Sequence, residues 1–388
     1  MSKKLQFDKN GRFVLMQVSD TQDLHNVRPT MIRMLNNAYD RIRPDFVVFT
    51  GDNILGNHLR DARFGNRHVI HTKQQELERM KRAIAHIIEP LEKRKIPFTM
   101  IYGNHDDMNE ITKAEQADIY RSYSMCRGLN STDSSIDVDT FDLPLYSSDG
   151  KKKLFNFWML DSAYMDKSKG KCHTTVSKST VDWYIKRSQE LKKENNNKPL
   201  PSIMFQHIPM PESACLMREC SFDNPKAVHF YDKEKNKDFY FCLDETKAEG
   251  EISEPIKGYS ENNGQLEAIK QQGDVIALVY GHEHKNNYIG YHDGLKIIQT
   301  STASFRCYGN HLRGVRVFEF DEKKPSEFNT YFLTYDDICG KGMLSRLAYI
   351  FDADGMEKEK YTLLAASAVG VGALALTGAY IYRLLKKQ

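Results

Sequence analysis

The feature that most constrains this sequence is an alternation of short apolar runs with amphipathic helical segments near its start. The segments 13–18, 45–50 and 97–102 are predominantly apolar and predict buried strands. Between them, 29–42 and 74–95 carry apolar residues spaced three and four apart, as one face of a helix requires. This β-α-β-α-β order predicts an α/β fold in which helices cover the strands of a sheet.

Later segments continue the pattern as far as residue 320. Further strands are predicted at 154–160, 202–206, 274–280, 295–299 and 315–320. Residues 208–273 are polar with few clear periods, so we interpret them as an insertion or lid. A chain of 388 residues fits one large or two ordinary domains. We predict one domain over 1–355, followed by a linker at 356–362.

Polar side chains that can carry chemistry follow five of these strands directly. They are Asp20 and Gln22, then Asp52, then Asn104, His105 and Asp106, then His207, then His282 and His284. Taken singly, each group is ordinary turn or cap chemistry, because Gly-Asp and Gly-Asn are common turn formers. Ligands of open α/β sheets bind at the carboxyl ends of the strands. Five such groups in this order therefore predict one shared site.

The residue types indicate metal chemistry at that site. Carboxylate oxygen and imidazole nitrogen suit zinc, iron and manganese. Two ions ~3.5–4 Å apart can clamp a phosphoryl group and activate a water. One carboxylate must bridge such a pair, and Asp52 is the natural candidate. No cysteine lies in these motifs, so thiolate ligands are not expected.

The order of the motifs resembles the calcineurin-like metallophosphoesterases, whose pattern is D-x-H, G-D-x-x, G-N-H-D/E, H and G-H-x-H. The matching segments are Asp20-Thr-Gln22, Gly51-Asp52-Asn53-Ile54, Gly103-Asn104-His105-Asp106, His207 and Gly281-His282-Glu283-His284. The resemblance spans about residues 12–320. Leu160-Asp161-Ser162 and the segment 249–255 are similar to the short purple-acid-phosphatase-like branch.

The resemblance implies a fold and an activity. The fold is a four-layer αββα sandwich of two mixed β-sheets flanked by helices. The activity is metal-dependent hydrolysis of phosphate monoesters or diesters, with a two-metal site and a metal-bound hydroxide as the nucleophile. The ions would be two divalent or trivalent metals, namely manganese, iron or zinc.

It also implies a role for each residue of the motifs. Asp20 and His284 would bind the first metal, and Asp52 would bridge both metals. The second metal would be bound by Asn104, His207 and His282. His105 would stabilise the phosphoryl group or protonate the leaving oxygen. We therefore expect Asp52 and His105 to be catalytic, and Asn104 and His105 to contact the substrate.

One position departs from the family pattern. Gln22 stands where D-x-H has its histidine, and an amide oxygen is a weaker donor than imidazole. Asp23 or His25 would replace it if the loop bends. We expect a first metal site that is weaker, or selective for manganese or iron(II) over zinc. Further candidates for the pocket are His25, Asp161 and Arg306, and each is more readily explained as a supporting or surface residue than as part of the pocket lining.

The C-terminus differs in composition from the rest of the chain. Residues 363–382 carry no charge, and a helix of that length spans a bilayer core of ~30 Å. A buried core helix is the alternative. The first residues lack an apolar leader. The fold expectation therefore includes a C-terminal transmembrane helix, with an anchor and short basic tail at 363–385. It predicts a single-pass, tail-anchored protein with its catalytic domain in the cytoplasm.

Charge and cysteine content limit the partners. The net charge of +3 gives no case for nucleic acid. The expected partners are a phosphoester substrate and the membrane, and no obligate protein partner is evident. Seven cysteines without a CxxC pair are interpreted as mostly reduced thiols. Cys215 and Cys220, the closest pair, are the candidates for a bridge in an oxidising compartment.

Two other functions compete with a phosphatase or phosphodiesterase. Loss of one metal through Gln22 would leave a non-catalytic or single-metal binding module recruited to a membrane. A nuclease of the same superfamily would need a basic groove, which the near-neutral charge disfavours. Metal content distinguishes the first alternative. The substrate itself does not follow from the fold.

Overall fold

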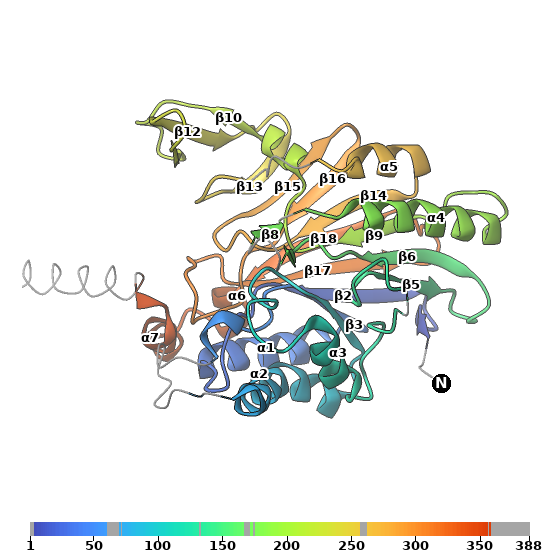
Figure 1. The fold of residues 1–388 in the computed structure, drawn as a ribbon, viewed down its shortest axis with the longest axis horizontal. Coiled ribbons are helices and arrows are strands. Elements are labelled where there is room, and N and C mark those ends of the chain that lie inside the picture. The colour runs from blue at the N-terminus through green and yellow to red at the C-terminus, as the bar shows by residue number, and fades with distance from the viewer. Residues whose placement is uncertain are drawn as a thin grey trace, which may run out of the picture.

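Two β-sheets stacked face to face, with helices on both outer faces, form the body of the molecule (Figure 1). This arrangement agrees with the predicted four-layer αββα sandwich of two mixed sheets. The computed structural model describes residues 4–59, 70, 72–131, 133–166, 171–173, 175–256, 262–355 and 357.

The five-stranded sheet holds the predicted N-terminal strands and has the order β18-β17-β2-β3-β4. Strands β2, β3 and β4 are parallel, whereas β17 runs antiparallel to β2 and β18 antiparallel to β17. Helices α1, α2 and α3 cover its outer face (Figure 1). The bounds are β2 Arg12–Val18, β3 Phe46–Thr50, β4 Phe98–Ile101, β17 Gly314–Asp321, β18 Phe328–Thr334, α1 Pro29–Ile42, α2 Lys73–Arg94 and α3 Lys113–Arg121.

The eight-stranded sheet has the order β1-β5-β6-β9-β14-β16-β15-β13. Its central strands β6, β9, β14 and β16 are parallel to one another. Helices α4 and α5 lie on its outer face (Figure 1). The bounds are β1 Leu5–Gln6, β5 Phe141–Tyr146, β6 Lys153–Met159, β9 Ser202–Phe205, β13 Ala248–Glu251, β14 Val275–Tyr280, β15 Asn287–His292, β16 Leu295–Gln299, α4 Lys178–Glu194 and α5 Gln265–Gln272.

Smaller elements complete the described chain. Two short strands form a separate pair, and three others form a three-stranded sheet. Two 3-10 turns and two C-terminal helices account for the rest. The bounds are β7 Tyr164–Asp166, β8 Lys171–His173, β10 Met217–Glu219, β11 Val228–Asp232, β12 Lys237–Leu243, η1 Gly56–His58, η3 Pro211–Leu216, α6 Tyr335–Cys339 and α7 Met343–Asp352.

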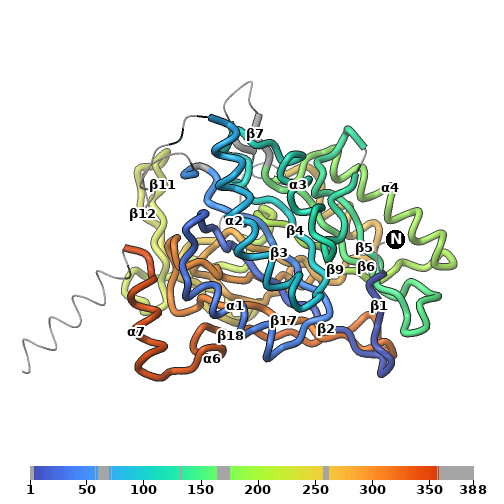
Figure 2. Tube along the Cα trace, turned by 90° about the horizontal axis from the view of Figure 1, so that it is seen from below, coloured from blue at the N-terminus to red at the C-terminus, as the bar shows by residue number. Residues whose placement is uncertain are grey.

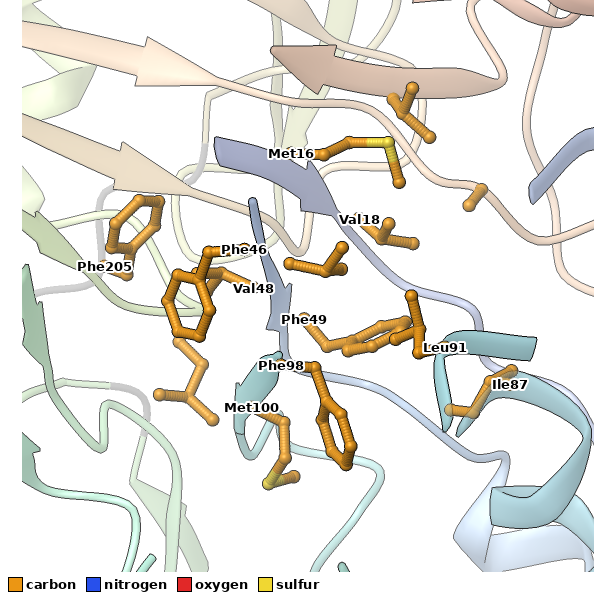
Figure 3. Packing of buried hydrophobic residues seen from close by; sticks show 14 of the residues in the cluster. Met16, Val18, Phe46, Val48, Phe49, Ile87, Leu91, Phe98, Met100 and Phe205 are labelled. Carbon is orange, nitrogen blue, oxygen red and sulfur yellow. The ribbon is translucent and has the colours of Figure 1, made fainter. Parts of the chain in front are cut away.

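The core between the sheets follows from the two-residue period of a strand. On β6, Phe155 and Phe157 face the five-stranded sheet, whereas Trp158 faces α4. The Trp158 ring meets Tyr184 of α4 edge to face, with centroids 5.1 Å apart. Figure 3 shows the corresponding packing around β3, where Phe46 and Val48 lie near Phe205 of the other sheet. This continuous apolar contact fixes the two sheets, and hence their ends, relative to each other.

The predicted insertion divides into three parts. Strands β10, β12 and β11 form the separate three-stranded sheet, which stands apart from the body in Figure 1. Strand β13 then pairs with β15 at the edge of the eight-stranded sheet. Helix α5 packs on the outer face of that sheet. The role of 208–273 as a lid stays a prediction.

The cysteine prediction needs a correction in this region. Cys220 forms a disulfide with Cys242, with their Cα atoms 6.0 Å apart, whereas Cys215 is a free, exposed thiol. Cys220 directly follows β10, and β10 is antiparallel to β12, which carries Cys242. The sequence did not reveal this pair, because Cys220 and Cys242 are brought together by the pairing of β10 with β12, and β11 lies between these two strands in the chain.

We expect the bridge to survive denaturation without reductant. After alkylation of the unfolded chain, peptide mapping should find Cys220 and Cys242 unmodified and linked, and Cys126 and Cys215 alkylated. Prior reduction should expose all four thiols and serves as the control. Alkylation of Cys220 before reduction would contradict the pairing.

The fold expectation is also corrected at the C-terminus. The predicted anchor at 363–385 lies outside the described residues, and no helix within the described part is long and apolar enough to cross a bilayer. The fold is therefore stated without a transmembrane helix. Helix α7 lies at one end of the molecule beside α1 (Figure 2), where Thr30 N donates to Asp352 Oδ2 at 2.8 Å.

Candidate metal centre

Parallel strands bring the predicted side chains together at the carboxyl ends of the strands of the two stacked sheets. β2, β3 and β4 are parallel in one sheet, and β9 and β14 are parallel in the other. The two sheets are joined close to this edge by Gln17, whose Nε2 donates to Thr50 Oγ1 at 2.9 Å and to Tyr280 O at 3.0 Å. The turns that follow these strands therefore meet.

Two overlapping groups of ligand atoms occupy the meeting point. One consists of Asp20, Asp52 and His284, and the other of Asp52, His207 and His282. Within each group the ligand atoms lie within 4.8 Å of one another. Asp52 belongs to both groups, as a bridging carboxylate must. This is the arrangement that the family roles require of a two-metal centre.

Unsatisfied buried atoms test whether a metal fits here. At the predicted ligands, Asp20 Oδ1, Gln22 Oε1, Asn104 Oδ1 and His207 Nε2 are among the buried atoms that form no hydrogen bond in the described part of the chain. Buried polar groups are nearly always paired, since an unpaired one is costly. All four atoms carry lone pairs and come from the predicted ligand set. The residues therefore fit bound cations.

Contacts at the Nδ1 atoms orient the imidazole rings of two of the histidines. His207 Nδ1 lies 2.9 Å from Thr50 O, and His284 Nδ1 lies 2.9 Å from Tyr308 O. The Nε2 atoms consequently face the carboxylates, at 3.5 Å from Asp52 Oδ2 for His207 and 3.3 Å from Asp20 Oδ1 for His284. A backbone carbonyl on one ring nitrogen is the usual support for a metal-binding histidine.

Asp52 is held in a crowded position. Its Oδ1 accepts the His105 backbone N–H at 2.8 Å. A Cβ on Gly103 would overlap Asp52, so glycine is required where the G-N-H-D turn crosses the carboxylate that both clusters share. Burial raises the pKa of Asp52, but the charge of His207, together with the charge and the backbone hydrogen bond of His105, outweighs it and holds that pKa below its usual range. The carboxylate is therefore ionised, as a metal ligand must be.

The backbone of the site is strained. Asp20, Gln22, Asp52 and His282 have φ of 50°, 31°, 47° and 73°. Non-glycine residues seldom adopt this left-handed region, at a cost of roughly 1–3 kcal/mol each. Four such residues at one centre indicate that orienting these side chains lowers the stability of the folded state.

His105 stands at the open side of the centre. Its side chain is 29% exposed, and its Nε2 lies 4.0 Å from Asp52 Oδ2. Burial lowers its pKa below the ordinary value, and the attraction of Asp52 only partly offsets this. A neutral imidazole at this place keeps one N–H that can donate to an incoming phosphoryl oxygen.

Gln22 touches the centre through its amide. Its Nε2 donates to Asp52 Oδ2 at 3.1 Å, while Oε1 has no partner. Asp23 does not replace it as a ligand. Asp23 Oδ1 accepts Leu24 N at 2.7 Å and pairs with Arg306, and Oδ2 accepts Arg28 N at 2.8 Å.

Of the three further pocket candidates, Asp161 and Arg306 have side chains that are engaged elsewhere. His25 lies beside α2, where its backbone carbonyl oxygen is 3.0 Å from His86 Nε2, while its buried ring Nδ1 has no hydrogen-bond partner. Asp161 forms a buried ion pair with Lys113 at 2.8 Å. Arg306 is bound to Asp23 and to the carbonyl of Asn26. They shape the loops around the centre and are not grouped with the ligand clusters.

Two supporting residues were not assigned a role from the sequence. Asp106 accepts backbone N–H groups of Asn53, Ile54 and Gly103 at 2.8–3.1 Å and so ties two ligand turns together. Ser162 Oγ accepts the His207 N–H at 3.1 Å. Both residues lie in segments that carry the family resemblance, and this could have identified them. Asp106 is the last residue of the G-N-H-D motif, and Ser162 is the last residue of Leu160-Asp161-Ser162.

Comparison with known proteins decides the family. The profile described as "Calcineurin-like phosphoesterase" matches residues 14–286. The chain belongs to this family. It is a metallophosphoesterase, and its curated relatives confirm the predicted likeness to purple acid phosphatases.

Relatives of this phosphoesterase include two proteins named for phosphatases. "Probable inactive purple acid phosphatase 29" of Arabidopsis thaliana is 26% identical over 338 residues, 79% of this chain and 76% of its own length. "Phosphatase DCR2" of Saccharomyces cerevisiae is 24% identical over 54% of this chain and 37% of its own length.

Solved structures resemble the phosphoesterase more distantly. A dimetal phosphatase from Danio rerio matches with a TM-score of 0.49 at 12% identity, covering 82% of this chain and 98% of its own. A purple acid phosphatase from yellow lupin matches with a TM-score of 0.43 at 11% identity, covering 87% and 56%.

Proposed function

We propose that this phosphoesterase hydrolyses phosphate monoesters or diesters with two metal ions, drawn from manganese, iron and zinc. The observation that carries the proposal is the pair of ligand clusters that share Asp52, together with four buried lone-pair atoms that lack partners. When bound, the ions would supply positive charge to the phosphoryl oxygens and lower the pKa of a water.

The protein residues then have separate tasks. Asp20, Asp52 and His284 would hold one ion, and Asp52, Asn104, His207 and His282 the other. Asp106 fixes the turns that carry Asp52 and Asn104, so that the ligands are positioned before substrate arrives.

His105 is the residue placed to handle the substrate directly. Its backbone N–H bonds to the bridging carboxylate, and its ring is partly exposed beside it. In its neutral form the ring can donate a hydrogen bond to a phosphoryl oxygen, and in its protonated form it can also pass a proton to the leaving oxygen. Asn104 precedes it and lines the same opening.

The activity is tested on p-nitrophenyl phosphate and bis-p-nitrophenyl phosphate. Purified protein loaded separately with manganese, iron(II) or zinc should cleave at least one ester, and the ratio of the two rates separates monoesterase from diesterase. If protein that holds two ions cleaves neither these nor a broad phosphoester panel, the proposed catalysis is wrong.

A binding module with one metal or none is the second candidate. Two observations favour it: the Gln22 amide stands where the family has imidazole, and several curated relatives carry "inactive" in their names. Metal analysis after full loading decides between them. One ion or fewer per chain supports the module, and two support the enzyme.

Gln22→His should strengthen the first metal site. An imidazole nitrogen is a better donor to manganese, iron or zinc than an amide. We expect about tenfold tighter binding at the weaker site, the low end of the range for changes around a metal. Calorimetric titration with manganese measures it, and Gln22→Ala is the matched control that should weaken the same site. Equal affinity in all three proteins would show that residue 22 is not a ligand.

The cysteines are the feature of the molecule that bears on its cell compartment. The Cys220–Cys242 disulfide favours an oxidising compartment over a reducing one. The expected cytoplasmic location is therefore not carried forward. The proposed partner is the phosphoester substrate, and its class is what the substrate panel would identify.

A further inference from the structure

Arg313 is a buried cation that plays no part in the proposed reaction. It lies just before β17, and its side chain is fully buried. Its NH2 donates to Cys307 O and to Asp354 Oδ2, each at 2.9 Å, and its NH1 lies 2.9 Å from Glu357 Oε2 in an ion pair without hydrogen-bond geometry. One guanidinium thus joins a loop near the metal centre to the C-terminal end of the described chain.

The loop that Arg313 holds supports a metal ligand. Tyr308 directly follows Cys307, and its carbonyl oxygen lies 2.9 Å from His284 Nδ1. The Tyr308 ring also stacks on the His284 ring, with centroids 4.2 Å apart and planes at 12°. Tyr308 therefore sets both the direction and the tilt of His284. The Cys307 carbonyl, one peptide earlier, is the atom that Arg313 fixes.

Further contacts bind the same loop to the C-terminal helix. Tyr349 of α7 donates from its hydroxyl to Asn310 O at 2.8 Å and lies 3.1 Å from Glu357 Oε1. The guanidinium of Arg313 lies 5.2 Å from the Phe305 ring and 5.8 Å from the Tyr349 ring. A Cβ on Gly309 would overlap the guanidinium, so the loop is closed tightly around it.

His207 of the second metal cluster is supported by other groups. His207 is aimed by Thr50 O and Ser162 Oγ, which belong to β3 and to the turn after β6. Arg313 contacts neither of these. A change at Arg313 should therefore reach His284 and leave His207 in place.

We propose that Arg313 is a positioning residue for the first metal site, and that through Cys307 and Tyr308 it couples His284 to the C-terminal segment around Asp354 and Glu357. The inference rests on the proposed two-metal site. The Arg313 guanidinium is held beside the Asp354 and Glu357 carboxylates, because separating them would leave unpaired charges in the interior of the protein.

Arg313→Lys tests the proposal in the full chain. Lysine keeps the charge but cannot bond Cys307 O and two carboxylates with a planar fork. We expect manganese to bind about tenfold more weakly at the first site, as for losses around a metal ligand, with the second site unchanged. Calorimetry gives both dissociation constants, and the manganese electron paramagnetic resonance spectrum reports the loss of the paired ions.

Arg187→Lys is the matched control. Arg187 also pairs with an aspartate and a glutamate, Asp142 at 2.8 Å and Glu190 at 2.9 Å, at a place remote from the centre. It should lose stability without changing either metal affinity. Equal weakening of the first site by both substitutions would overturn the proposal, because the effect would then be general loosening.

Glu357→Gln tests the link to the C-terminal segment and covers the case in which Arg313→Lys fails to fold. It removes one charge beyond α7 and touches no residue of the loop's backbone. We expect a weaker first site with an unchanged second site. First-site affinity equal to wild type in Glu357→Gln would overturn the coupling. Wild-type protein that binds fewer than two manganese ions would overturn the proposed function instead.

Discussion

Replacing His105 by alanine is expected to lower kcat for the preferred ester by about 100- to 10,000-fold, the range for loss of a general acid. Metal content should stay unchanged. The reason is geometric: the ring lies at the open side of the centre, and it belongs to neither ligand cluster. Steady-state rates on metal-loaded protein, together with metal analysis of the same sample, measure both quantities.

The control for His105 is His292→Ala. His292 is the last residue of β15 and pairs with Leu295, the first residue of β16. It therefore lies at the end of these strands that is opposite to the metal centre. Its removal should change neither rate nor metal content. A kcat for His105→Ala equal to wild type would remove His105 from the mechanism, and loss of metal in that variant would make it a structural residue.

Replacing Asp52 by asparagine is expected to abolish activity through loss of metal. Among the described residues, Asp52 is the carboxylate that both clusters share. Asparagine keeps the size of the side chain but removes the negative charge that faces His207 and that would face the two proposed ions. Because changes in supporting residues already cost 10–100-fold in metal affinity, loss of the bridging ligand should cost at least about 100-fold at each site. Metal titration and the ester assays measure the two effects.

Asp293→Asn separates this effect from a general change of charge. Asp293 directly follows β15, at the end of the strand opposite to the metal centre, and forms an exposed ion pair with Lys270 at 2.8 Å. The Asp293→Asn substitution removes one negative charge, as Asp52→Asn does, and should leave both metal dissociation constants unchanged. Two ions bound with wild-type affinity to Asp52→Asn would rule out a bridging role.

Local pattern was enough for much of the fold. The apolar spacing predicted α1 at 29–42 and β16 at 295–299 with the bounds that the structure has, and α2 within one residue at each end. These elements are defined by periodic burial, which the sequence displays directly. The positions of chemical residues after parallel strands likewise predicted which side chains meet.

Other features depended on contacts between distant residues. The Cys220–Cys242 pair arises from the pairing of β10 with β12, two strands that are not consecutive in the chain, so spacing pointed to the wrong partner, Cys215. Asp23 was an alternative ligand until the structure placed it against Arg306, which lies 283 residues away in the chain. Asp161 was a pocket candidate until it was found paired with Lys113.

The sequence by itself determined the chemistry of this phosphoesterase: an alternating α/β pattern, and Asp, Asn and His at the carboxyl ends of the right strands. Those features are local, because periodicity and motif order need no partner. Tertiary structure alone decided which polar groups remain available to bind an ion. Asp20, Gln22, Asn104 and His207 keep unpaired atoms at the centre, whereas Asp23, Asp161 and Arg306 are neutralised by distant charges. Pairing of buried charges depends on the packing of the whole chain, and no local pattern records it.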